Sequence, residues 1–87
     1  MANAPRPKFW VVYEVDTTDK LHTLIGICSG RQSAVQNILD RFGSYYASGV
    51  DIHIDQRTGV VTMSLQGYRY YYRAEPKFTD QFWESDR

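Results

Sequence analysis

The chain has 87 residues and a mass of 10.1 kDa, with 43% hydrophobic residues and ten basic against ten acidic side chains. A chain this short forms one domain, which buries only about 60% of the surface of its unfolded state. No apolar run approaches the roughly 18 residues of a membrane-spanning helix, and a net charge of zero argues against a whole-protein field that attracts nucleic acid or anionic membranes.

The first residues and the cysteine content favour a reducing compartment. Residues 1–8 combine prolines with basic side chains and lack the apolar stretch of a secretory signal, so we expect a flexible N-terminal tail there. Cys28 is the single cysteine, which excludes an internal disulfide and a multi-cysteine zinc site. We therefore expect a cytoplasmic protein.

Residues 9–28 predict two strands joined by a polar turn. Residues 9–15 alternate in two rows that are both mostly apolar: Phe9, Val11, Tyr13 and Val15 on one face, and Trp10, Val12 and Glu14 on the other. Residues 16–20, DTTDK, have the composition and length of a hairpin turn. Alternation resumes in residues 21–28, which completes a β-hairpin.

An amphipathic helix is predicted over residues 30–42. Its apolar positions recur at the spacing of one buried stripe: Ala34, Val35, Ile38, Leu39 and Phe42. Ser29 followed by Gln32 has the spacing of a capping box, with Ser33 as a competing start. Gly43 fits the left-handed residue that commonly ends a helix.

Three further segments follow the helix. Residues 50–55 alternate as a half-buried strand, residues 56–59 form a turn in which Gly59 takes a positive φ, and residues 60–65 form the return strand. Residues 68–73, YRYYYR, either continue that strand after a bulge at Gly67 or form a fifth one. Near the end of the chain, Phe78, Phe82 and Trp83 have helical spacing and form either a docked turn of helix or a sticky tail.

These elements predict an α+β fold of the order ββαββ, in which one helix packs on a mostly antiparallel sheet of four to five strands. We expect a flexible tail at 1–8, a single domain at 9–75 and a C-terminal extension at 76–87. One apolar helix face must meet one apolar sheet face. We therefore expect the helix stripe to pack against Val11, Ile25, Ile27, Ile52, Ile54 and Met63.

The basic and aromatic run at 68–73 is the first candidate for chemistry. Sheets that bind single-stranded nucleic acid use aromatic rings for base stacking and guanidinium groups for phosphate contacts. Alternation separates the run into Tyr68, Tyr70 and Tyr72 on one face and Arg69, Tyr71 and Arg73 on the other. An ordinary amphipathic strand has the same pattern, so both interpretations stay open.

Catalytic and metal-binding signatures are weak. The sequence has no GxSxG, P-loop, HExxH or GxGxxG motif, so we expect a protein that is not an enzyme and takes no cofactor. His22, Cys28 and His53 have side chains that bind zinc. However, six residues of extended strand place His22 about 20 Å from Cys28, so we expect no shared metal ion.

Aromatic residues are more numerous than one helix can cover, with 13 Phe, Tyr and Trp among the 87 residues. Interface hot spots are enriched in Tyr, Trp and Arg. We therefore predict a partner-binding surface formed by Trp10, Arg69, Tyr70, Tyr72, Arg73, Phe82 and Trp83. In the alternative, the C-terminal segment folds back over the outer face of the sheet as a second small core.

Several segments together resemble small uncharacterised proteins of phages and mobile elements. The resemblance rests on an aromatic opening strand, an acidic turn, the LIG segment at 24–26, a helix that starts at Ser29 and a closing hairpin. It covers residues 8–65 and lies in architecture rather than in a specific motif. Some compact phage proteins of this shape, including certain anti-CRISPR proteins, act by occupying a surface of a host complex. The resemblance implies an inhibitor or adaptor and assigns no functional residues.

The leading hypothesis is therefore a non-enzymatic protein-binding module, with a phage-type inhibitor of a host complex as its specific form. A single-stranded nucleic-acid-binding protein that uses the tyrosines is the first alternative, and a small structural homodimer is the second. A partner protein, with nucleic acid as the alternative, a monomer or homodimer and no membrane contact are the corresponding expectations.

Overall fold

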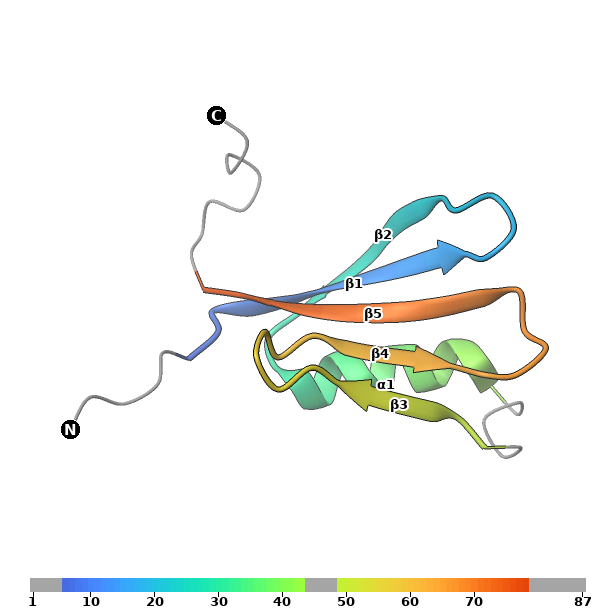
Figure 1. The fold of residues 1–87 in the computed structure, drawn as a ribbon. Coiled ribbons are helices and arrows are strands. Elements are labelled where there is room, and N and C mark those ends of the chain that lie inside the picture. Colours follow the sequence, from blue (N-terminus) through green and yellow to red (C-terminus); the bar gives the residue numbers. More distant parts are fainter. Residues whose placement is uncertain (1–5, 44–48, 79–87) are drawn as a thin grey trace.

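The computed structural model describes residues 6–43 and 49–78. Along the chain it contains β1 (Phe9–Asp16), β2 (His22–Cys28), α1 (Arg31–Phe42), β3 (Asp51–Ile54), β4 (Val61–Ser64) and β5 (Tyr70–Lys77), as Figure 1 shows. The run at 68–73 thus contributes to a separate fifth strand. β5 also continues to Lys77, since Pro76 and Lys77 pair with Trp10 and Phe9, so the C-terminal extension does not begin at residue 76 as expected.

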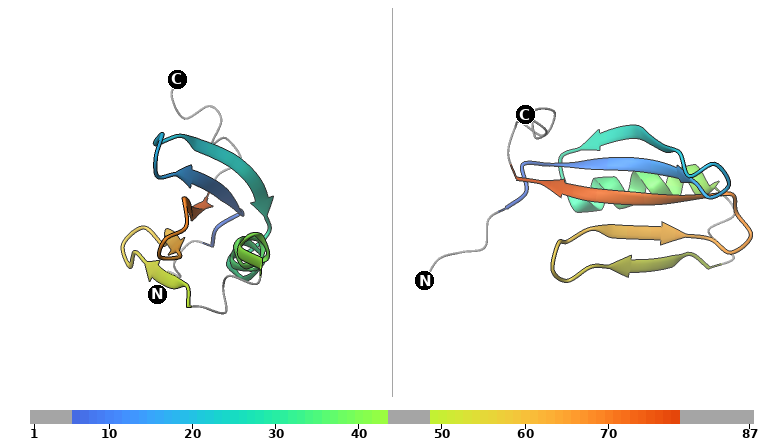
Figure 2. Two further views of the ribbon diagram at one scale, coloured as in Figure 1. Left: turned by 90° about the vertical axis from the view of Figure 1, so that its right-hand side faces the viewer. Right: turned by 45° about the horizontal axis from the view of Figure 1, so that its top comes forward.

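The strands form one antiparallel sheet with the order β2-β1-β5-β4-β3. The α1 helix covers one face and packs mainly on β2, β1 and β5, as the views in Figure 2 show. This arrangement confirms the α+β class. Because β2 and β3 are the two edge strands, α1 connects opposite edges of the sheet, and within residues 6–43 and 49–78 no helix covers the other face.

The core lies between α1 and the row of β1 that contains Trp10 and Val12. Its buried members are Trp10, Val12, Ala34, Ile38, Phe42, Val61, Met63, Tyr72 and Ala74. The expected packing against Val11, Ile27, Ile52 and Ile54 is therefore wrong, whereas Met63 lies in the core and Ile25 packs against it. Both rows of β1 are apolar, so the alternation alone did not indicate which row faces the helix.

Tyr72 is the largest fully buried side chain of this core. Its ring meets that of Phe42 edge to face, with 5.2 Å between centroids, and its hydroxyl donates a hydrogen bond of 2.9 Å to Glu14 Oε2. Glu14 is the residue opposite Tyr72 on β1. The pair therefore satisfies the one polar atom that this ring brings into the core.

Glycines begin and end α1. Gly30 is the N-cap residue, and no side chain caps the helix, so the predicted capping box of Ser29 and Gln32 is wrong. At the other end, Gly43 has a φ of 60° and its N–H donates to the carbonyl of Leu39, in agreement with the predicted stop. Gly59 has a φ of 80° in the turn between β3 and β4, as the sequence predicted.

Candidate interaction surface

The predicted surface residues do not form one surface. Trp10 and Tyr72 are only 7% and 2% exposed and belong to the core, and Tyr70 packs half-buried beside it. Their assignment as exposed binding residues is therefore wrong, because the row of β5 that contains Tyr70 and Tyr72 faces α1. Phe82 and Trp83 lie outside the described residues.

Arg69 fastens the β1–β2 turn to the start of β5. Its guanidinium donates to both carboxylate oxygens of Asp16 and lies 3.4 Å from a carboxylate oxygen of Asp19. The Arg69 carbonyl also accepts hydrogen bonds from the backbone N–H and the hydroxyl of Thr17. The Asp16 carboxylate in turn accepts hydrogen bonds from the backbone N–H groups of Thr18 and Asp19. Arg69 thus holds two loops together through groups 50 or more residues apart.

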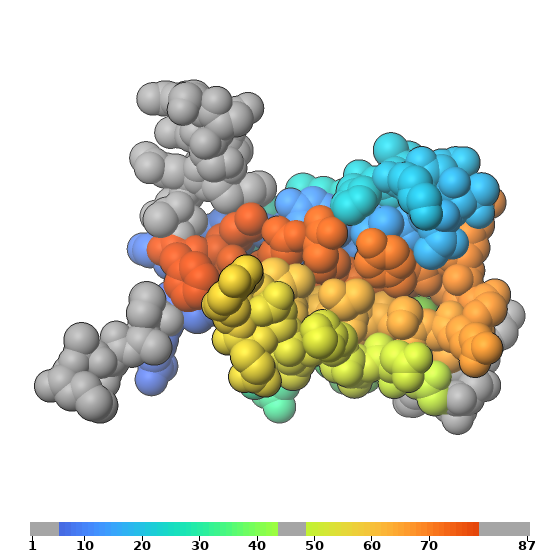
Figure 3. All heavy atoms as spheres, in the orientation of Figure 1, coloured from blue at the N-terminus to red at the C-terminus, as the bar shows by residue number. Residues whose placement is uncertain are grey.

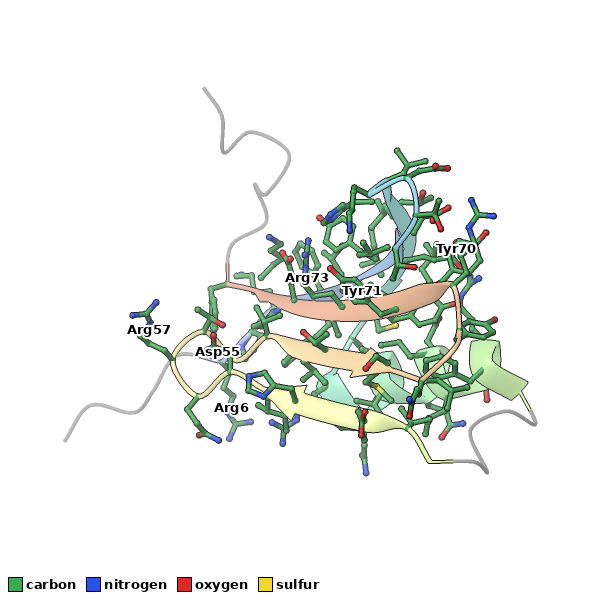
Figure 4. All side chains as sticks on the ribbon, turned by 45° about the vertical axis from the view of Figure 1, so that its right-hand side comes forward. Arg6, Asp55, Arg57, Tyr70, Tyr71 and Arg73 are labelled. Atoms are coloured by element: carbon green, nitrogen blue, oxygen red, sulfur yellow. The ribbon has the colours of Figure 1, made fainter. Side chains whose placement is uncertain are left out.

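Arg73, by contrast, lies on the helix-free face. Cross-strand pairs on β2, β1 and β5 form three rows there: Ile27, Val11 and Glu75; Leu24, Tyr13 and Arg73; and His22, Val15 and Tyr71. We call these nine residues the open-face patch. Figure 3 views this face, and Figure 4 shows Tyr71 and Arg73 next to one another along β5.

Tyr13 and Arg73 occupy the central row of the open-face patch. The Arg73 guanidinium carbon lies 5.3 Å from the centroid of the Tyr13 ring, within cation–π range. The same guanidinium is ion-paired with Glu75 and lies 3.3 Å from His22 Nδ1. Glu75 also pairs with Lys77 at 3.3 Å. Side chains from three strands therefore contact and position Arg73.

The β2 side of the open-face patch is apolar and exposed. Leu24 is 47% and Ile27 is 59% exposed, although both are large aliphatic residues. They flank the valines of β1, of which Val11 and Val15 are buried. The open-face patch thus changes from aliphatic on β2, through the tyrosine of β1, to charged and aromatic on β5.

The two edge strands of the sheet differ in how well they are protected against pairing with strands of other chains. Natural edge strands are commonly short or charged, which prevents pairing with other chains. β3 has four residues, with Asp51 in it and Asp55 directly after it, whereas β2 has seven residues and contains no Asp, Glu, Lys or Arg. β2 does carry one irregularity, because its pairing with β1 shifts register opposite Val12 and Tyr13.

The pKa values of Asp16 and Tyr72 are shifted by these contacts. The hydrogen bond from Arg69, aided by the backbone N–H groups of Thr18 and Asp19, lowers the pKa of Asp16, although partial burial opposes this effect. Burial, together with the hydrogen bond to Glu14, raises the pKa of Tyr72 well above its usual value of 10. Both groups stabilise the fold rather than supply a reactive site.

Other site types have little support in the described ranges 6–43 and 49–78. Among these residues no three His, Cys, Asp or Glu side chains gather as metal ligands, and no helix is long and apolar enough to cross a membrane. A shallow hollow of about 500 Å³ is lined by Gly49, Val50, Asp51, Leu65 and Gln66. Asp51 is the single titratable group among these five described lining residues, so they provide no acid–base pair.

Comparison with known proteins gives no relative for this chain. No protein-family model matches it, and no curated protein or solved structure matches it either.

Sequence alternation placed Arg73 and Tyr71 on one face, as the structure does. The sequence did not predict that Tyr13, Leu24 and Ile27 lie on the same face as Arg73, because the pairing of β2, β1 and β5 brings them together.

Proposed function

We propose that this protein is a non-enzymatic protein-binding module that contacts its partner through the open-face patch. The observation that carries the proposal is the exposed pair Leu24 and Ile27 beside the Tyr13–Arg73 contact, on a sheet face without a covering helix. Interfaces commonly combine an apolar centre with Tyr and Arg anchors and a polar rim. The open-face patch contains the same kinds of side chain, with its exposed apolar residues on β2 and its Tyr and Arg residues on β1 and β5.

The charges of the open-face patch favour a protein over a nucleic acid as its partner. Within the patch, Arg73 is ion-paired with Glu75, so one cation and one carboxylate cancel. Glu75 also pairs with Lys77, which lies beside the patch. Phosphate binding needs several cations in excess. Leu24 and Ile27 also offer aliphatic surface rather than the flat rings on which bases stack.

The partner that fits has an apolar surface opposite Leu24 and Ile27 and hydrogen-bond acceptors opposite Arg73. The outer edge of β2 adds main-chain N–H and C=O groups, since β2 pairs with β1 alone. An extended segment of the partner beside β2 would continue the sheet, a common mode of peptide recognition. The partner thus buries apolar side chains and main-chain groups together.

A paired-variant capture experiment tests the proposal. The full-length protein, the double variant Leu24→Ala, Ile27→Ala and the control Ile52→Ala, Ile54→Ala serve as baits, because the control removes two exposed aliphatic residues from the other edge. We expect a nuclease-resistant protein that wild type and control retain and that the open-face variant loses. Equal retention by all three baits, or loss on nuclease treatment, would contradict the proposal.

The inhibitor or adaptor role within a cytoplasmic host complex remains the specific form of this proposal, and it rests on the architectural resemblance to phage proteins alone.

A homodimer is the competing use of the same surface. Sedimentation velocity separates the two, because a homodimer predicts a concentration-dependent dimer that Leu24→Ala, Ile27→Ala abolishes, whereas a heterologous partner predicts a monomer at every concentration.

A further inference from the structure

Among the described residues, the charged side chains are separated along the molecule. One end of the sheet, where β1 begins and β5 ends, has five cations: Arg6, Lys8, Arg31, Arg57 and Lys77. The acids of the same end are Asp55 and Glu75. At the opposite end, three cations, Lys20, Arg41 and Arg69, face five acids, Glu14, Asp16, Asp19, Asp40 and Asp51. Arg73 lies between the ends. The described residues therefore have a charge of +3 at the first end and −2 at the second.

The fold itself gathers these cations, which are distant in the sequence. Lys8 N–H bonds to the carbonyl of Lys77, which joins the N-terminal segment to the end of β5. Gly59 approaches the ring of Pro76, which brings the β3–β4 turn to the same place. Arg6, Asp55 and Arg57 accordingly lie together at this end in Figure 4. We call the five cations the basic end.

Three of the five guanidinium and ammonium groups are open to a ligand. Arg6, Arg31 and Arg57 are exposed, and within the described residues no carboxylate pairs with them. The carboxylate of Asp55 is turned to its own loop, where it accepts the backbone N–H groups of Arg57 and Thr58. Glu75 is shared between Arg73 and Lys77. Within the described residues, the two acids of this end thus form no ion pair with those three arginines.

An exposed ring accompanies the basic end. Phe78 directly follows Lys77 and is 45% exposed. Channels and grooves for single-stranded nucleic acid combine cations for the phosphates with aromatic rings for the bases. An acidic protein would use the cations but would have no particular need for the ring. The first turn of α1, which lies at the same end and contains no acid, adds positive potential of the same sign.

We propose that the basic end binds single-stranded nucleic acid through its phosphates, with Phe78 as the stacking residue. This activity is independent of the proposed protein-binding function, since the open-face patch and the basic end share no residue. It differs from the sequence-based alternative, which assigned nucleic-acid binding to the Tyr/Arg run of residues 68–73.

Fluorescence anisotropy of labelled dT20 with the full-length protein tests the proposal across 20–200 mM NaCl. Arg6→Gln, Arg57→Gln removes two charges from the basic end, and Lys20→Gln, Arg41→Gln removes two from the opposite end as a matched control. Each phosphate contact contributes about 0.7 to the slope of log affinity against log salt for a single strand. We expect wild type to bind dT20. In Arg6→Gln, Arg57→Gln the magnitude of the slope of log affinity against log salt should be smaller by about 1.4, and in Lys20→Gln, Arg41→Gln it should be unchanged.

Three further results decide the assignment. Phe78→Ala should weaken dT20 binding without changing the salt slope, because it removes stacking and no charge. A dT20·dA20 duplex or poly-glutamate that binds as tightly as dT20 would overturn the single-strand assignment. Absence of wild-type binding at 20 mM NaCl, or equal losses in the two charge variants, would overturn the basic end as a site. None of these results depends on the open-face patch, so the two proposals fail separately.

Discussion

Replacing Tyr72 tests whether this tyrosine of β5 belongs to the core or to a binding surface. The ring is fully buried against Phe42, and large buried aromatics cost about 3–5 kcal/mol when replaced by Ala. A domain of this size has a free energy of unfolding of about 4–13 kcal/mol. Tyr72→Ala is therefore expected to lose a large part of the total and, in the less stable part of that range, to unfold the protein.

Tyr72→Phe keeps the ring and removes only the hydroxyl that donates to Glu14. A hydrogen bond to a charged group contributes about 1.5 kcal/mol at the lower end of its range, which corresponds to a fall in melting temperature of about 6–12 °C. Tyr71→Ala, on the helix-free face, is the control and is expected to cost about 1 kcal/mol or less. Urea unfolding followed by circular dichroism measures the free-energy change of each variant, and a thermal melt measures the fall in melting temperature.

The pH dependence of the same variants provides a second measurement. Because the pKa of Tyr72 is raised in the folded protein, its contribution is complete below pH 10 and is lost as the pH rises above the ordinary tyrosine pKa. The stability difference between wild type and Tyr72→Phe should therefore narrow above pH 10. A Tyr72→Ala protein as stable as wild type, with Tyr71→Ala strongly destabilised, would refute the assignment of faces.

Three other substitutions have expected outcomes. Asp16→Asn removes the ion pair with Arg69 and should lower the melting temperature at neutral pH. Because the pKa of Asp16 is lowered in the folded protein, wild type should lose this advantage as the pH falls below 3.8. A difference in melting temperature that does not change with pH would contradict the role of the charge. Gly59→Ala places a side chain at a φ of 80° and should cost about 1–2 kcal/mol by urea unfolding, so an unchanged midpoint would show that the turn relaxes. Gly30→Asp supplies the absent N-cap side chain in open space and should stabilise by about 0.5–1 kcal/mol in thermal melts, whereas destabilisation would mean that the helix does not begin there.

Alternation and helical periodicity predicted the strands and the helix well, because each strand has at least one apolar row and α1 has one apolar stripe. They did not predict which face of β1 meets the helix. Trp10 and Val12 compete there with Val11 and Val15, and all four are buried in the structure. The choice depends on the packing of Phe42 against Tyr72, a contact between residues 30 positions apart.

The candidate surfaces needed the strand order as well as the pattern. Arg73 was predicted as a surface residue from its alternation, but its neighbour Tyr13 is 60 positions away and reaches it only because β1 pairs with β5. Arg69 lies in the same Tyr/Arg run as Arg73, and the sequence predicted both as binding residues. In the structure, Arg69 instead forms an ion pair with Asp16. Likewise, the charge separation among the described residues arises from the topology. Basic residues from before β1, from the start of α1, from the β3–β4 turn and from the end of β5 lie at one end of the sheet.

The open-face patch is tested most directly by site-specific photocrosslinking in the cells in which the protein naturally occurs. A benzophenone amino acid in place of Leu24 reports on the open-face patch, and the same amino acid in place of Ile52 reports on the opposite edge. We predict a light-dependent adduct with one partner protein from the Leu24 position and none from the Ile52 position. An adduct from Ile52 alone, or none from either position in folded protein, would contradict the account.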